Sequence, residues 1–88
     1  MMRPYELKET VDLMCSSDYK ERFYAEYWQT RIRYEKLNQM VNSYRDGKLS
    51  FTPSCSISLL EGQCDAMREY LSRLEVRARV ENVDLEEM

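Results

Sequence analysis

Two apolar stripes of equal length, separated by a short polar connection, constrain the fold of this chain more than any other feature. In both stripes the spacing alternates between three and four residues, an average period of about 3.5 that is typical of two helices packed side by side. The first stripe consists of Phe23, Tyr27, Thr30, Tyr34, Leu37, Val41 and Tyr44, and the second of Ile57, Leu60, Cys64, Met67, Leu71, Leu74 and Ala78. Equal length and a short link predict an antiparallel helical hairpin.

The register of this hairpin follows from the positions of the stripes along the chain. Each stripe extends over about 32 Å of helix at a rise of 1.5 Å per residue. If the chain folds back at the middle of the connection, the numbers of facing residues add up to about 101. The predicted facing pairs are Phe23 with Ala78, Tyr27 with Leu74, and Tyr34 with Met67.

Capping residues predict the limits of the helices. Asp18 is a good N-cap, and Glu21 follows it at the spacing of a capping box. Gly47 suits the left-handed position after a helix, and Pro53 suits a first turn. The fold class is therefore all-α: a short helix over 4–15, a long helix over 18–46, a connection over 47–53, a second long helix over 54–80, and an acidic tail over 81–88.

A second set of apolar residues lies outside the two stripes. Its members are Tyr24, Trp28, Ile32 and Met40 on the first long helix, and Leu59, Tyr70, Val76 and Val80 on the second. The short helix can cover part of this set, and the remainder favours contact between protomers, so that a homo-oligomeric helical bundle is expected. The alternative is a monomeric three-helix bundle in which these residues pack only against residues 4–15.

Composition excludes several classes of function. The chain has 88 residues, a net charge of −3 and no histidine. Without histidine there is no Ser-His or Cys-His pair, and there is no glycine-rich phosphate loop, so no enzyme and no cofactor are expected. The cysteines Cys15, Cys55 and Cys64 lack metal-ligand spacing, so no metal site is expected. An isoelectric point of about 5.0 argues against DNA binding, and no segment has the length and apolarity of a membrane span. We expect a cytosolic, reduced protein.

Arginine and tyrosine are unevenly distributed over the predicted hairpin. Its open end, opposite the connection, collects Tyr19, Lys20, Arg22, Arg73, Arg77 and Arg79. Nearby acids are Asp18, Glu21, Glu26, Glu75 and Glu81. One interpretation is a mixed surface lattice of salt bridges that contributes little to stability. The other is a site in which Arg forks hold phosphate and Tyr rings stack on bases. The pattern alone favours neither.

The sequence also resembles a known family. The stretches "DYKERFYAEY", "YEKLNQMV" and "LLEGQCDAMREYLSRLEVR" are similar to small helical-hairpin proteins of phages and prophages, including crAss-like phages. The matching positions are Asp18, Tyr19, Arg22, Glu26, Leu37, Leu59, Leu60, Gln63, Met67, Tyr70, Leu74 and Arg77. The resemblance extends over residues 18–80. That family looks related to the hairpin domain of anti-CBASS and anti-Thoeris sponge proteins.

The resemblance implies a function. Such sponge proteins capture cyclic nucleotide signals of bacterial immune systems between the protomers of a helical oligomer, and they do not cleave them. By resemblance, we expect a phage or prophage immune-evasion protein that acts as a homo-oligomer in the cytoplasm of the bacterial host. The alternative is a small helical module that binds another protein, either as an inhibitor of a host protein or as a phage assembly factor.

Six residues are the candidates for ligand binding. We predict that Tyr19 and Arg22 act together with Arg77 at the open end, because Phe23 belongs to the seam and Asp18 and Glu21 to the cap. The second-choice cluster is Tyr70 with Arg31 and Arg73, since Arg31 falls opposite Tyr70 in the predicted register.

Overall fold

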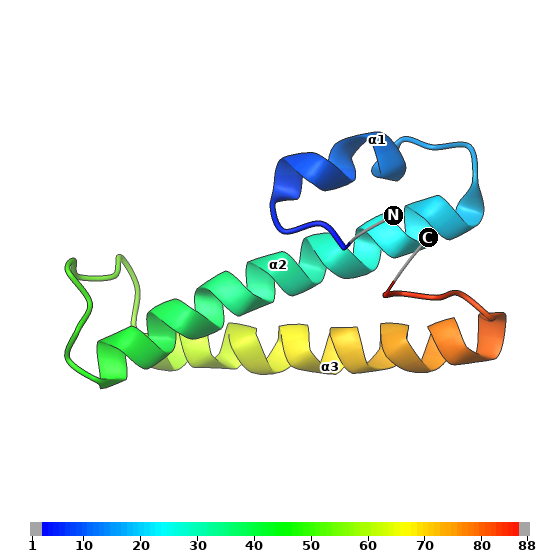
Figure 1. Ribbon diagram of the computed structural model, residues 1–88. Helices are drawn as coiled ribbons and strands as arrows, with labels where there is room; N and C mark the ends of the chain where they lie inside the picture. Colours follow the sequence, from blue (N-terminus) through cyan, green and yellow to red (C-terminus); the bar gives the residue numbers. More distant parts are fainter. Residues whose placement is uncertain (1–2, 87–88) are drawn as a thin grey trace.

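The computed structural model describes residues 3–86, and this part of the chain contains helices and no strand. A short N-terminal helix is formed by the 3-10 helix η1 (Leu7–Thr10) and by α1 (Val11–Met14), and two long helices follow, α2 (Tyr19–Arg45) and α3 (Ile57–Glu81). In Figure 1, α2 lies in the middle, with the short helix on one side and α3 on the other. The predicted all-α class, with a short helix and two long packed helices, is confirmed.

The antiparallel register of α2 and α3 is visible in three hydrogen bonds between side chains of the two helices. They join Tyr19 to Glu81, Tyr27 to Glu75, and Tyr34 to Arg68. All three pairs fit the predicted register to within one residue. The spacing of the two stripes therefore fixes the height at which each residue of α2 meets α3.

The helix limits differ from the expected ones where a different residue acts as cap. Asp18 caps α2, and its carboxylate accepts a hydrogen bond from the Lys20 amide. At α3 the cap is Ser56, whose hydroxyl accepts from the Leu59 amide at 3.1 Å, so the helix begins at Ile57 and not at residue 54. The short helix begins at Leu7 and not at residue 4, and its first turn is a tight 3-10 turn.

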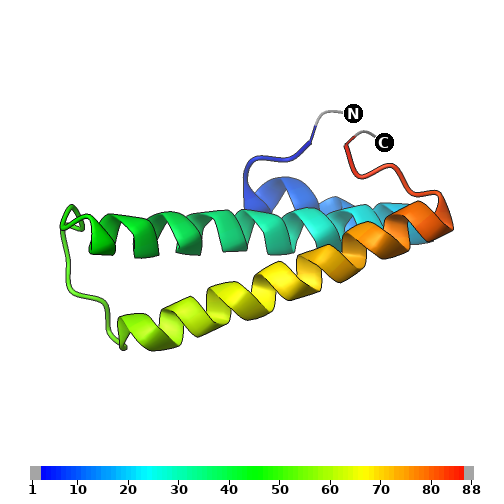
Figure 2. The same cartoon turned by 90° about the horizontal axis from the view of Figure 1, so that it is seen from below.

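The C-terminal tail has a structural role that its acidic composition did not indicate. Asn82 adopts a left-handed conformation with φ of 59°, which ends α3 and turns the chain back. Val83 is then buried, and Leu85 packs against the main core cluster. The Trp28 indole N–H donates to the Leu85 carbonyl at 2.6 Å. Figure 2 shows the tail running back along the hairpin from the end of α3.

The second apolar set divides into a covered part and an exposed part. Tyr24, Trp28 and Ile32 are buried on α2, next to the short helix and the tail. The four members on α3, namely Leu59, Tyr70, Val76 and Val80, are all exposed. The chain itself therefore covers three of the four α2 residues, with Met40 partly buried, and leaves the α3 residues uncovered. No helix in residues 3–86 is long and apolar enough to cross a membrane.

Candidate functional site

The structure brings Tyr19 and Arg77 together at the open end of the hairpin, together with Glu81. The Tyr19 hydroxyl donates to the Glu81 carboxylate at 2.6 Å, and Arg77 donates to the Tyr19 oxygen at 3.0 Å and to Glu81 at 3.3 Å. The hydrogen bond to Glu81 raises the pKa of Tyr19, and the same bond lowers the pKa of Glu81. Both donors of this predicted site are thus occupied by a carboxylate of the chain's own C-terminal segment.

Arg22 lies apart from that pair. Its guanidinium donates to the Ser16 carbonyl at 2.9 Å, which ties α2 to the turn that precedes it. The predicted trio of Tyr19, Arg22 and Arg77 is therefore not assembled as one site, and the contact of Arg22 is structural.

The second predicted cluster is dispersed. The Tyr70 hydroxyl donates to Glu26, and Arg73 pairs with Glu69 at 2.9 Å on the outer side of α3. Arg31 contacts neither residue and lies in a groove between the two helices. The hairpin register sets the height of a residue along the bundle, but the direction of its side chain depends on rotation about its own helix.

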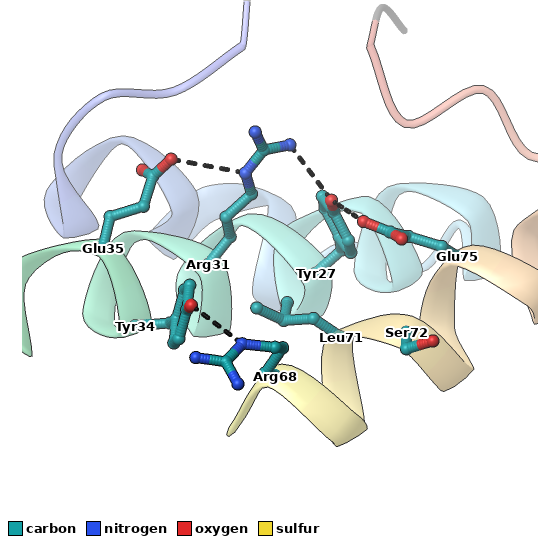
Figure 3. A pocket seen from close by; sticks show the side chains of 8 residues that line it. All are labelled: Tyr27, Arg31, Tyr34, Glu35, Arg68, Leu71, Ser72 and Glu75. Carbon is teal, nitrogen blue, oxygen red and sulfur yellow. Dashed lines mark hydrogen bonds and ion pairs between the residues drawn. The ribbon is translucent and has the colours of Figure 1, made fainter. Parts of the chain in front are cut away.

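This groove encloses a cavity of about 410 Å³ between α2 and α3. Figure 3 shows Leu71 between two Tyr–Arg pairs, one on each side of it. The lining residues are Tyr27, Arg31, Tyr34, Glu35, Arg68, Leu71, Ser72 and Glu75. An apolar floor with a few converging polar groups is the usual form of a small-molecule site.

One side of the groove is a chain of hydrogen bonds centred on Tyr27. Its hydroxyl donates to Glu75 at 2.6 Å and accepts from Arg31 at 3.1 Å, and Arg31 also pairs with Glu35 at 3.4 Å. Burial raises the pKa of Tyr27 to about 12, and the hydrogen bond to Glu75 acts in the same direction. Arg31 stacks over the buried Trp28 ring, 4.8 Å from its centroid, so its guanidinium is held in place.

The other side of the groove is less constrained. Arg68 donates to the Tyr34 hydroxyl at 3.1 Å and pairs with Asp65 at the same distance. Its side chain is 59% exposed, against 33% for Arg31. Arg68 is therefore the cation of the groove that can move toward a ligand at the lowest cost.

A second cavity, of about 250 Å³, adjoins the first toward the connection. It is lined by Asn38, Val41, Asn42, Arg45, Glu61, Cys64, Asp65 and Arg68. Arg68 lines both cavities, so the groove has two chambers with a guanidinium between them. Arg45 pairs with Glu61 in the second chamber.

The groove offers groups suited to binding. Arginine and amide groups supply hydrogen-bond donors, and carboxylates supply acceptors. Burial raises the pKa of Cys64, so its thiol stays protonated and weakly nucleophilic. Within residues 3–86, no three His, Cys, Asp or Glu side chains are grouped so that they could hold a metal ion.

Sequence reasoning placed Tyr27 and Tyr34 in the packed seam and did not use Arg68. The available signal was the tyrosine hydroxyl, because a buried tyrosine needs a polar partner at the edge of the seam. In the antiparallel register these partners are Glu75 and Arg68, which stand one residue away from the expected facing positions.

Comparison with known proteins gives one family. A family model described as Sequestin matches residues 17–80, which include α2, the connection and nearly all of α3. All residues that line the two chambers lie within this range, whereas Glu81 and the tail lie outside it. No curated protein and no solved structure matches the chain significantly.

Proposed function

Because this chain belongs to the Sequestin family, we propose that it sequesters a cyclic nucleotide signal of a bacterial immune system without cleaving it. The family name agrees with a sequestering protein. By the resemblance described above, such a protein serves a phage or prophage in the cytoplasm of its host and acts as a homo-oligomer.

The two-chambered groove with Arg68 between its chambers is the observation that supports this proposal. A cyclic dinucleotide has two bases and a central ring that carries two phosphates. Arginine forks hold phosphate through paired charge-assisted hydrogen bonds, and aromatic rings offer surfaces for bases. In the proposed complex, Arg68 and Arg31 bind phosphate, and the partly exposed Tyr34 ring lines the space for a base.

The carboxylates of the groove fit a nucleotide rather than a simple anion. Glu35 and Glu75 are acceptors, and nucleobases and riboses present N–H and O–H donors that carboxylates bind well. Exposed ion pairs such as Arg68 with Asp65 contribute only about 0–1 kcal/mol. Exchange of Asp65 for a phosphate therefore costs little, and the freed carboxylate becomes available to solvent.

Sequestration without catalysis acts by mass action. The bound signal is removed in proportion to the amount of protein, so the protein must bind tightly and be abundant. Water is excluded from charge-assisted contacts when the ligand is enclosed, which strengthens them. A homo-oligomer supplies such enclosure if the open side of the groove is covered by another protomer.

Thermal unfolding against a panel of cyclic di- and trinucleotides and cyclic ADP-ribose isomers tests the proposal. A ligand present at about 100 times its dissociation constant stabilises the native state by about 2.7 kcal/mol, which raises the melting temperature of a domain of this size by roughly 10–20 °C. We expect such a shift for one or two members of the panel.

Three arginine variants localise the site. Arg68→Gln should abolish the shift, whereas Arg79→Gln should retain it, because Arg79 is an exposed arginine of α3 that does not line the groove. Arg77→Gln tests the open-end site and should also retain the shift. A panel without any shift would overturn the proposal, and a shift lost only in Arg77→Gln would move the site to the open end.

A further inference from the structure

The outer face of α3 carries a third stripe with the same spacing as the two core stripes. Its members are Leu59, Gly62, Ala66, Glu69, Arg73, Val76 and Val80, and all seven are exposed. Val76, Leu59 and Val80 are 47%, 63% and 76% exposed. Within residues 3–86, Figures 1 and 2 show α3 at the edge of the molecule, with the other helices and the tail on the side of α2. A solvated helix face usually carries polar residues at these positions.

Gly62 in this stripe is unexplained by the single chain. It lies inside α3, and a Cβ placed on it would meet no atom within 4 Å. Glycine inside a helix costs about 1 kcal/mol relative to alanine. Nothing within the monomer requires a missing side chain here, whereas the close approach of another backbone or a bulky side chain does.

The stripe is complementary to an antiparallel copy of itself. If a two-fold axis passes at the level of Leu71, the small residues Gly62 and Ala66 face the bulky Val80 and Val76 of the second copy. Glu69 then faces Arg73 of the second copy, and the reverse contacts follow by symmetry. The six residues extend over about 27 Å of helix at 1.5 Å per residue.

Other arrangements of the same two faces lose this complementarity. In a parallel pair, equal residues meet, so that Glu69 faces Glu69 and Arg73 faces Arg73, which is repulsive. An antiparallel pair shifted by one heptad places Glu69 opposite Ala66 and Arg73 opposite Gly62. The charges then lose their partners, and Val80 faces no residue of the stripe.

We propose that two copies of this chain associate through the outer faces of their α3 helices, antiparallel and with the two-fold axis at the level of Leu71. This pairing rests on the homo-oligomer of the proposed function and names one of its contact surfaces, apart from the contact that covers the groove, and it does not require the ligand. A two-fold axis perpendicular to both helices leaves the two grooves open on the same side of the pair. The Glu69–Arg73 pair of each copy, 2.9 Å long within the chain, becomes part of a cluster of four charges.

A charge-reversal experiment tests the pairing without any ligand. Sedimentation velocity of the full chain should show a dimer at micromolar concentration. Glu69→Arg and Arg73→Glu should each associate at least tenfold more weakly, because each places like charges opposite one another. An equimolar mixture of the two variants should regain the dimer, since the reversed charges are again complementary. Circular dichroism of each variant checks that the helices remain folded.

The outcomes decide the proposal independently of nucleotide binding. A wild-type chain that is monomeric at 100 μM, or single variants that associate as well as the wild type, would overturn it. A mixture that fails to regain the dimer would also overturn it, because only reciprocal pairing of Glu69 with Arg73 explains recovery. Ligand binding enters none of these measurements, so failure of the proposed function leaves their result unaffected.

Cysteine crosslinking tests the register. With Cys15→Ser and Cys55→Ser as background, because both thiols are exposed, Ala66→Cys/Val76→Cys should give a covalent dimer on mild oxidation. The matched control Leu59→Cys/Val76→Cys reports the arrangement shifted by one heptad, keeps Glu69 and Arg73, and should remain monomeric on a denaturing gel. Efficient crosslinking of the control and not of the first variant would contradict the register.

Discussion

The two halves of the hairpin have the same heptad spacing but differ in what covers them. In the first half of α2, seven residues are buried: Phe23, Tyr24, Ala25, Tyr27, Trp28, Thr30 and Ile32. In its second half, within the same fully described helix, Val41 alone is buried. The first half lies between α3, the short helix and the tail (Figure 1), whereas the second half packs against α3 and is reached by the N-terminal segment through the ion pair of Arg3 with Glu35.

This difference shows why the groove lies where it does. The short helix and the tail form a third layer on α2. This layer encloses the aromatic side chains, and Arg31 lies over the Trp28 ring. Beyond this layer two helices alone leave their seam partly open to water, so polar residues can line it without a large desolvation cost. The cavity begins at Tyr27, inside the covered half, and continues toward the connection.

The largest expected difference between the halves is the loss in the free energy of unfolding when a core side chain is truncated. Trp28→Ala removes a side chain with no exposed surface, and we expect a loss of about 3–5 kcal/mol in the free energy of unfolding. Leu37→Ala in the second half of α2 should cost about 1–2 kcal/mol, because part of that side chain is already hydrated. Urea unfolding measures both. Equal losses would contradict the division of the hairpin into two unlike halves.

The tail should stabilise the covered half of the hairpin and not the other half. Val83→Ala/Leu85→Ala removes apolar contacts with the core cluster, and we expect a loss of about 2–3 kcal/mol. The Trp28 emission should also shift to longer wavelength as water reaches the indole. Glu86→Ala, which changes an exposed residue of the same segment, is the matched control and should stay within 0.5 kcal/mol of the wild type, as is usual for surface positions. An unchanged stability of the double variant would show that the tail does not cover the core.

The hydroxyl of Tyr27 belongs to the covered half and lines the groove. Tyr27→Phe leaves Glu75 and Arg31 without their shared partner, so the free energy of unfolding should fall by about 1–2 kcal/mol. Tyr44→Phe, at an exposed position near the connection, should change it by less than about 0.5 kcal/mol. Chemical unfolding of the two variants side by side makes the comparison. A loss at Tyr44 that matches the loss at Tyr27 would contradict this assignment.

The smallest effect is spectroscopic and concerns the pKa of Tyr27, which burial raises to about 12. The neutral hydroxyl is favoured in the folded state, so its contribution to stability is complete below pH 10 and is lost as the pH rises toward 12. The difference in tyrosinate absorbance between wild type and Tyr27→Phe should therefore titrate near pH 12. A difference that titrates near pH 10 would show an unburied hydroxyl.

Most of the fold was predictable because it depends on periodicity. The two stripes gave the hairpin and its register, and Asp18 gave the start of α2. The tail was not predictable from its composition, because four acids in its eight residues obscure Val83 and Leu85. Their burial depends on the left-handed turn at Asn82, a residue that adopts this conformation more readily than most but not always.

The candidate site was predictable only in part. The meeting of Tyr19 and Arg77 was predicted from their shared place at the open end of the hairpin, and the register made Arg31 a candidate residue. The partners of Arg31 did not, because they depend on which way each side chain points around its helix. Tyr27 and Tyr34 fitted the seam so well that their hydroxyls received no role, although these hydroxyls connect the seam to the arginines of the groove.

The central claim is that the groove around Arg68 holds a cyclic nucleotide and leaves it intact. Equilibrium dialysis of the wild type and Arg68→Gln against the same panel, followed by heat release and chromatography of the bound fraction, tests it most directly. We expect the wild type to retain at least one member and to release it unchanged, and Arg68→Gln to retain at least tenfold less. Equal retention by the two proteins, retention of no member by the wild type, or release of a cleaved product would contradict the claim.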